Sequence, residues 1–269
     1  FADAETELTT TLNDKLRVAG VEDATQVGPR KVTRSATLTG AVPGAPALTE
    51  PGDIYGFVSL PGVIGTPATA IGDESILNYN VPPFVYGGQT YTRLGVNSNG
   101  YLVVGGGTSE DNNCCDLTQI PDPARPNNVL APFWTDLDGT GTPGIYIDVV
   151  TDGVDEWIIV EWQVNVWGTT SNRQFQVWLG TGGTEDIVFA YNPAALPALP
   201  PGQDLIVGAE NVNGSGGEQL PAGTAPTEDL RIVSSDPVPG ASLSYQVEVI
   251  GLTTGTGQVT TSMEASTVP

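Results

Sequence analysis

The chain has 269 residues, 34 glycines, 22 prolines and a formal net charge of −22, which suits one large domain with small appendages. Residues 35–269 carry 25 acids against four arginines and no lysine. Such an acidic body argues against nucleic acid as a partner, because it repels phosphates, and it suits a divalent cation or a secreted, soluble surface. No apolar run approaches the roughly 18 residues that a membrane span needs.

The N-terminal segment has the only helix-like pattern. Ala4, Leu8, Leu12 and Leu16 recur every four residues, with acids early in the segment and bases late. This pattern predicts a short helix over residues 3–18.

Composition also predicts the division of the chain. Residues 32–42 are Thr-rich and strand-like, and a Pro-, Gly- and Ala-rich link follows at 43–52. We therefore expect three parts, which are an N-terminal helix plus strand at 1–50, a main domain at 51–250, and an extended Thr-rich tail or linker at 251–269.

Short strand-like segments recur between turn signals from residue 53 onward. The clearest begins at Asp155, and one of its faces is apolar throughout; this face, expected to be buried, comprises Ile158, Val160, Trp162, Val164 and Val166. The opposite face carries Glu161 and Gln163 and is expected to face solvent. A strong hairpin signal lies at 97–100, Asn-Ser-Asn-Gly. Many short strands without intervening helices predict an all-β fold, an antiparallel, jelly-roll-like β-sandwich.

One stretch joins an apolar strand to an acidic loop. Residues 127–139 read NNVLAPFWTDLDG, and Asp136 and Asp138 follow the apolar part directly. With Thr140 and backbone carbonyls, these acids could supply hard oxygen ligands to calcium. The alternative is that they cap a turn by accepting hydrogen bonds from backbone amides.

The two cysteines, Cys114 and Cys115, are adjacent. A vicinal disulfide that stiffens a loop is the preferred interpretation, and two free thiols or links to another chain are the alternatives. A tetrahedral zinc site is improbable because the chain has no histidine and no third cysteine.

Several residues are candidates for contact or catalysis. Trp157 and Trp167 lie on the polar face of their strand and could form a contact surface, unless a loop covers them. Glu161 with Asp136 could be imagined as a glycosidase pair, but this interpretation is disfavoured because Glu161 is expected to be solvent-facing. Serine catalysis lacks a histidine base, so the sequence predicts a protein that is not an enzyme.

Four motifs carry a resemblance to a known family. They are residues 94–105 (LGVNSNGYLVVG), 124–138 (ARPNNVLAPFWTDLD), 158–162 (IIVEW) and 172–179 (NRQFQVWL). Together they resemble a β-sandwich domain found near the C-termini of secreted bacterial subtilisin-like proteases and surface proteins, and distantly the nidogen extracellular domain. The resemblance implies an extracellular or cell-surface location and carries no catalytic residues.

Two functions follow as expectations. The chain is either an accessory module of a secreted bacterial protein that binds substrate, wall or matrix, or a self-assembling subunit of an extracellular filament or surface layer joined by strand addition. The expected partners are a protein, a cell-surface polymer or further copies of the chain. Glycoside hydrolase or lectin activity is a distant third.

Overall fold

The structure is a computed structural model that describes residues 5–12, 16–18, 31–50, 56–114, 119–140, 143–196, 199, 203–251 and 259–266, with side chains described only within 41–240. The chain forms two compact units. Unit 1 comprises residues 1–42 and 239–269, and unit 2 comprises residues 43–238. Unit 2 is thus inserted in sequence between the two halves of unit 1, whereas composition placed the divisions after residues 50 and 250.

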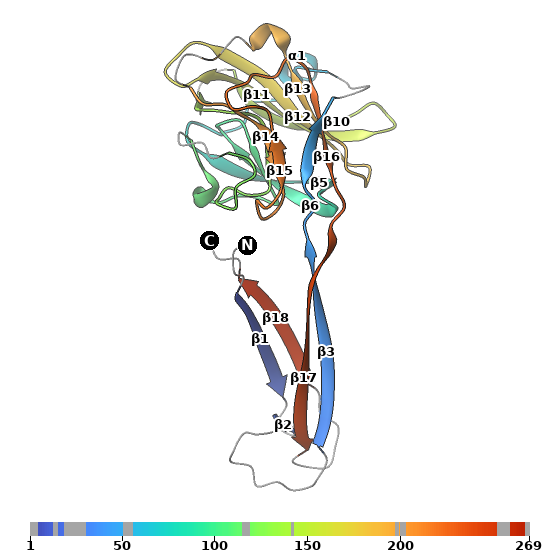
Figure 1. Ribbon diagram of the computed structural model, residues 1–269. Helices are drawn as coiled ribbons and strands as arrows, with labels where there is room; N and C mark the ends of the chain where they lie inside the picture. The colour runs from blue at the N-terminus through green and yellow to red at the C-terminus, as the bar shows by residue number, and fades with distance from the viewer. Residues whose placement is uncertain are drawn as a thin grey trace. The chain divides into compact units, whose positions relative to one another are not determined.

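Unit 2 consists of two antiparallel sheets that pack on one shared core (Figure 1). The first sheet has the order β10-β11-β12-β13-β16-β4, with β9 also paired to β11. Its strands are β4 (Pro46–Thr49), β9 (Leu137–Asp138), β10 (Gly144–Thr151), β11 (Glu156–Val166), β12 (Asn172–Gly180), β13 (Ile187–Tyr191) and β16 (Leu230–Ser234).

The second sheet has the order β15-β14-β8-β7-β6-β5. Its strands are β5 (Ile76–Tyr86), β6 (Gln89–Asn97), β7 (Leu102–Val104), β8 (Val129–Trp134), β14 (Ile206–Glu210) and β15 (Gly217–Gln219). Three short helical turns complete the described part of the unit, namely α1 (Leu60–Val63), η1 (Ser109–Asp111) and η2 (Pro193–Ala195). These elements confirm the predicted all-β sandwich.

The core between the sheets is built on aromatic stacking. The β11 residues that the sequence placed inward are all buried there, which confirms the alternation. The Trp162 indole stacks on Phe175 at a centroid distance of 5.2 Å, and Phe175 stacks on Phe133 at 5.3 Å. Trp162 Nε1 donates to the carbonyl of Asn97 at 2.9 Å, so the indole N–H is satisfied although the ring is fully buried.

The outer face of the first sheet is also covered, and the prediction that Glu161 faces solvent is wrong. Glu161 has no exposed surface, because the segment 56–65 lies over this face. Leu60 N donates to Glu161 Oε2 at 2.7 Å, and Gln176 Nε2 donates to the same oxygen at 3.0 Å. Gln176 also bonds both backbone groups of Val58. The polar side chains of this face thus replace a neighbouring strand as partners for the segment's backbone.

Unit 1 contains only strands among its described residues, and the helix predicted over 3–18 is wrong. The strands are β1 (Glu5–Leu12), β2 (Leu16–Val18), β3 (Lys31–Val42), β17 (Val238–Gly251, beginning at the last residue of unit 2) and β18 (Val259–Ser266). Four of the eight β1 residues are threonine, whose β-branched side chain favours strands, and pairing with β18 supplies hydrogen bonds over the whole strand.

The sheets of unit 1 are small. β1 and β18 form a two-stranded antiparallel sheet, and β2-β17-β3 form a three-stranded one. The expected C-terminal tail therefore contains a strand in residues 259–266. Among the described residues, no helix has the length and hydropathy that a membrane crossing requires.

Candidate functional site

A buried asparagine turn holds the acidic loop that follows β8. Asn99, in the hairpin between β6 and β7, is fully buried and accepts a hydrogen bond from Leu137 N at 2.9 Å through its Oδ1. Its backbone carbonyl accepts from Thr135 N at 3.2 Å, and its Nδ2 donates to Glu74 Oε2 at 3.2 Å. The predicted hairpin therefore fixes the path of the loop and links it to the segment before β5.

Four carboxylates gather at this loop, and we call Asp73, Glu74, Asp136 and Asp138 the acidic loop cluster. Burial raises the pKa of Asp73, and the charge of Asp138 raises it further. Burial also raises the pKa of Asp136, to which the charges of Asp73 and Asp138 contribute. The pKa of Glu74 is raised by burial, with Asn99 opposing that shift and the charges of Asp73 and Asp136 adding to it. These carboxylates repel one another, and a cation would relieve the repulsion.

The three residues predicted as metal ligands are only partly brought together. Asp138 Oδ1 accepts from Thr140 N at 2.7 Å and from Thr140 Oγ1 at 2.5 Å, which is the turn-capping arrangement that was the alternative to calcium. Asp136 instead groups with Glu74 and Cys114, whose potential ligand atoms lie within 4.8 Å of one another. Glu74 and Asp136 supply oxygen atoms of the kind that calcium prefers.

Cys114 is disulfide-bonded, so its sulfur has no thiolate charge to offer a metal. Cys115, the only other cysteine of the chain, lies outside the described residues. The vicinal disulfide accordingly stays a prediction. If calcium binds at the acidic loop cluster, its ligands among the described residues are carboxylates and not Cys114.

The two candidate tryptophans have different environments. Trp157 is 4 % exposed, because it belongs to the apolar cluster that the segment 56–65 covers, and its ring meets Trp178 edge-on at 6.1 Å. Trp167 is 54 % exposed, and its backbone N–H donates to the carbonyl of Asp136 at 3.0 Å. The Trp167 side chain also opposes the rise in the pKa of Asp73. Trp167 therefore presents an indole to solvent at the border of the acidic loop cluster, and Trp157 presents none.

Glu161, the other candidate acid, is buried and hydrogen-bonded to its neighbours. Burial raises its pKa, and hydrogen bonds from Gln163, Leu60 N and Gln176 oppose that shift. Because its two oxygens accept these bonds beneath the segment 56–65, the carboxylate holds this segment on the sheet.

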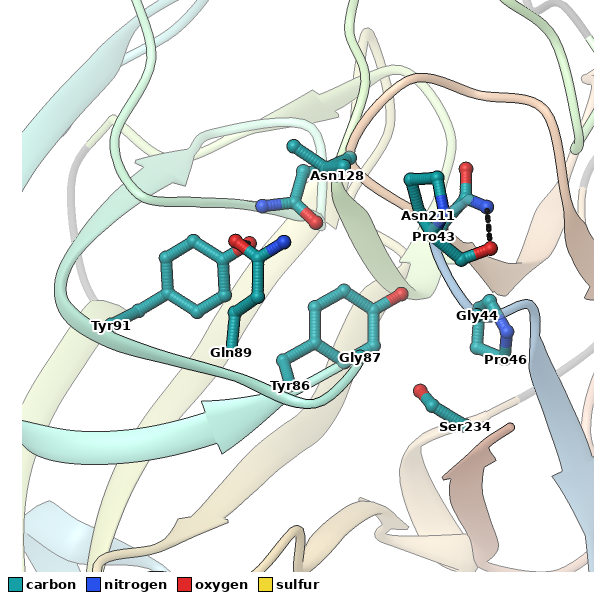
Figure 2. Close-up of a pocket in the computed structure, with 11 residues that line it drawn as sticks. Pro43, Gly44, Pro46, Tyr86, Gly87, Gln89, Tyr91, Asn128, Asn211 and Ser234 are labelled. Atoms are coloured by element: carbon teal, nitrogen blue, oxygen red, sulfur yellow. Dashed lines mark hydrogen bonds between the residues drawn. The ribbon is translucent and has the colours of Figure 1, made fainter. Parts of the chain in front are cut away.

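Unit 2 also has a small pocket with a neutral lining (Figure 2). It is lined by Pro43, Gly44, Pro46, Tyr86, Gly87, Gln89, Tyr91, Asn128, Asn211, Val212 and Ser234. Tyr86 OH donates to the carbonyl of Glu210 at 2.6 Å, and Asn211 Nδ2 donates to the carbonyl of Pro43 at 3.5 Å. None of the described lining side chains is a carboxylate, imidazole or amine, so the pocket suits contact with an uncharged polar group.

Sequence reasoning did not find Asp73 and Glu74. They precede β5, more than 60 residues before Asp136, and no local motif connects the two segments. The link is the Glu74–Asn99 hydrogen bond, which depends on the folded hairpin. A sequence pattern alone carries no sign of such a tertiary contact.

Two antiparallel sheets closed over one core define a β-sandwich domain. A family model described as NIDO related matches residues 56–247, which is well over half of the chain. The chain therefore belongs to the NIDO-related, or nidogen-related, family, and domains of this family are typically extracellular. No curated protein and no solved structure matches the chain significantly.

Proposed function

We propose that this chain is a non-catalytic extracellular β-sandwich module that acts by assembly, with copies joined by strand addition through unit 1. The observation that supports this proposal most directly is the pairing of β1 with β18. An isolated two-stranded sheet is marginally stable in water, and three or more strands or a covering element are needed for independent stability. Both strands of this sheet have an unpaired edge among the described residues.

The register of the β1–β18 sheet adds to this argument. It sets Glu7 directly opposite Glu264, and like charges in that position destabilise a pair of strands. Leu8 is the register partner of Met263, and Leu12 is the register partner of Val259. A second copy would provide hydrogen-bond partners for the open edges.

Strand exchange between copies predicts a specific cross-link. Leu8 and Met263 are register partners, and opposed residues of antiparallel strands are close enough for a disulfide. We expect a mixture of the single variants Leu8→Cys and Met263→Cys to form a disulfide-linked heterodimer on mild oxidation. Peptide mapping by mass spectrometry identifies the 8–263 link and separates it from the native cysteines.

The control mixture combines Leu8→Cys with Val154→Cys, because Val154 is 88 % exposed in a turn of unit 2 and reports random collision. A yield for the 8–263 pair no higher than for this control would contradict strand exchange. Electron microscopy and size-exclusion chromatography of the full chain complete the test, since strand addition predicts polymers.

A second candidate is the accessory module of a secreted bacterial protein, which binds substrate, wall or matrix. The exposed indole of Trp167 beside the acidic loop cluster favours this function, because exposed tryptophans recur at binding surfaces. A chain that stays monomeric at high concentration would support this candidate over assembly. A glycan array and a panel of hydrolase substrates test the lectin and glycoside hydrolase alternatives.

Calcium binding at the acidic loop cluster is a further part of the proposal, supported by the proximity of Glu74 and Asp136. We expect EDTA to lower the melting temperature by several degrees, since a ligand that binds only the folded state stabilises it. Asp136→Asn should remove this EDTA effect and weaken calcium binding measured by calorimetry.

Asp152→Asn is the matched control, because Asp152 lies in an exposed turn and should leave the EDTA effect intact. The same melting temperature with EDTA and with added calcium, together with no heat of binding, would rule out the site.

A further inference from the structure

We infer that Asn213 is an acceptor for an asparagine-linked glycan. Residues 213–215 read Asn-Gly-Ser, and this is the one place in the 269-residue sequence where Asn-X-Ser/Thr occurs with X other than proline. The motif is the acceptor sequence for N-glycosylation, and in an extracellular protein it marks a surface loop. The inference rests on the extracellular location in the proposed function.

The structure places this motif in the turn between β14 and β15, with Asn213 exposed. Ser215 Oγ donates to Asn213 Oδ1 at 2.7 Å, and Ser215 N donates to the same oxygen at 3.3 Å. Both bonds use the amide oxygen. The Nδ2 atom, to which the sugar would be attached, donates to no described residue, and Asn213 as a residue is exposed.

Buried neighbours fix the turn so that it presents Asn213 outward. Asn211 is 3 % exposed, and its Oδ1 accepts from Ser215 N at 3.0 Å and from Gly216 N at 3.3 Å. Gly214 has φ of 62°, and a Cβ at that position would lie 2.0 Å from the carbonyl oxygen of Asp122. Glycine is therefore required between the asparagine and the serine for a reason of packing, while Asn213 itself stays outside the packed region.

The sugar donor for this attachment is a lipid-diphosphate-linked oligosaccharide. The bond between the first sugar carbon and the diphosphate oxygen breaks, a bond from that carbon to Asn213 Nδ2 forms, and Nδ2 loses one proton. The amide oxygen keeps its bonds to Ser215, so the folded turn accommodates the product without loss of a described hydrogen bond.

The test is secretion of the full chain, with a signal peptide, from eukaryotic cells. We expect an intact mass above that of the polypeptide, which PNGase F reduces to the polypeptide mass with conversion of residue 213 to aspartate. Asn213→Gln and Ser215→Ala should each abolish the added mass, and Ser215→Thr should retain it. These variants lie in an exposed turn, and unchanged thermal melting shows that they fold.

A control variant carries a new acceptor sequence in a second exposed turn. Asp152→Asn with Val154→Ser creates Asn-Gly-Ser at 152–154, where Val154 is 88 % exposed. An unmodified Asn213 in the secreted chain overturns the inference, and a glycan at position 152 would then show that donor and enzyme were present. Because the 8–263 cross-link tests unit 1 in unglycosylated protein, the outcome at Asn213 is independent of it.

Discussion

Replacing Glu210 with glutamine is expected to raise the free energy of unfolding at pH 8–9 by on the order of 4 kcal/mol and to leave it nearly unchanged at pH 5. For a domain of this size, such a gain corresponds to a rise in melting temperature on the order of 10 °C. Melting curves of the wild type and Glu210→Gln between pH 5 and pH 9 provide the measurement.

The reason is the burial of a carboxyl group in the turn region of β14. Glu210 is 1 % exposed, and burial raises its pKa from 4.5 to about 8, with the charge of Asp122 adding and the hydrogen bond from Asp122 N opposing. The folded chain holds this proton while the unfolded chain loses it above pH 4.5. The contribution of neutral Glu210 to the free energy of unfolding is therefore fully present below that pH and is lost as pH rises towards about 8.

Glutamine removes this loss because it is neutral at every pH and keeps an oxygen that can accept from Asp122 N, which lies 3.1 Å from Glu210 Oε2. Glu228→Gln is the control, since Glu228 is an exposed carboxylate of the same unit and its replacement removes one negative charge from the surface and not from the interior. Parallel pH profiles for wild type and Glu210→Gln would show that Glu210 is ionised in the folded chain and that this account is wrong.

Gly100→Ala is expected to cost more than about 4 kcal/mol of folding free energy, or to prevent folding. Gly100 has φ of 81°, and a Cβ there would lie 2.1 Å from the carbonyl oxygen of Phe133. Relief of that contact requires the hairpin after β6 to move away from β8. Such a shift would also disturb the bond from Leu137 N to Asn99, which positions the acidic loop cluster. Chemical denaturation of the purified variant measures the loss.

Gly153→Ala separates the backbone penalty of a positive φ from the steric clash with Phe133. Gly153 has φ of 96°, but a Cβ there would meet nothing within 4 Å. This variant should cost about 1 kcal/mol, which is the backbone penalty alone. Equal losses for Gly100→Ala and Gly153→Ala would mean that the close approach to Phe133 has no energetic consequence.

Sequence periodicity predicted the parts of the fold that depend on local pattern. The inward face of β11 and the hairpin at 97–100 both follow from residues adjacent in the chain, and both are present. The helix predicted for the N-terminal segment was wrong because residues four positions apart lie on the same face of a strand as well as of a helix. The threonine content and the pairing with β18 decide in favour of a strand.

The candidate site was less accessible to sequence reasoning, because its properties depend on distant segments. Glu161 alternates with apolar residues as an exposed side chain would, yet the segment 56–65 returns to cover it. Asp136 was recognised, but its neighbours Asp73 and Glu74 were not. The perturbed pKa of Glu210 likewise arises from burial, which its local sequence does not reveal.

The insertion of unit 2 between β3 and β17 has a consequence for evolution. Its two ends, β4 and β16, are hydrogen-bonded neighbours, with Pro46 opposite Ser234, and β3 and β17 are themselves paired. Residues 46 and 234, where the chain enters and leaves the sandwich, are thus paired whatever the length of the segment between them. Insertions within unit 2 can therefore accumulate during evolution without changing the strand order of unit 1.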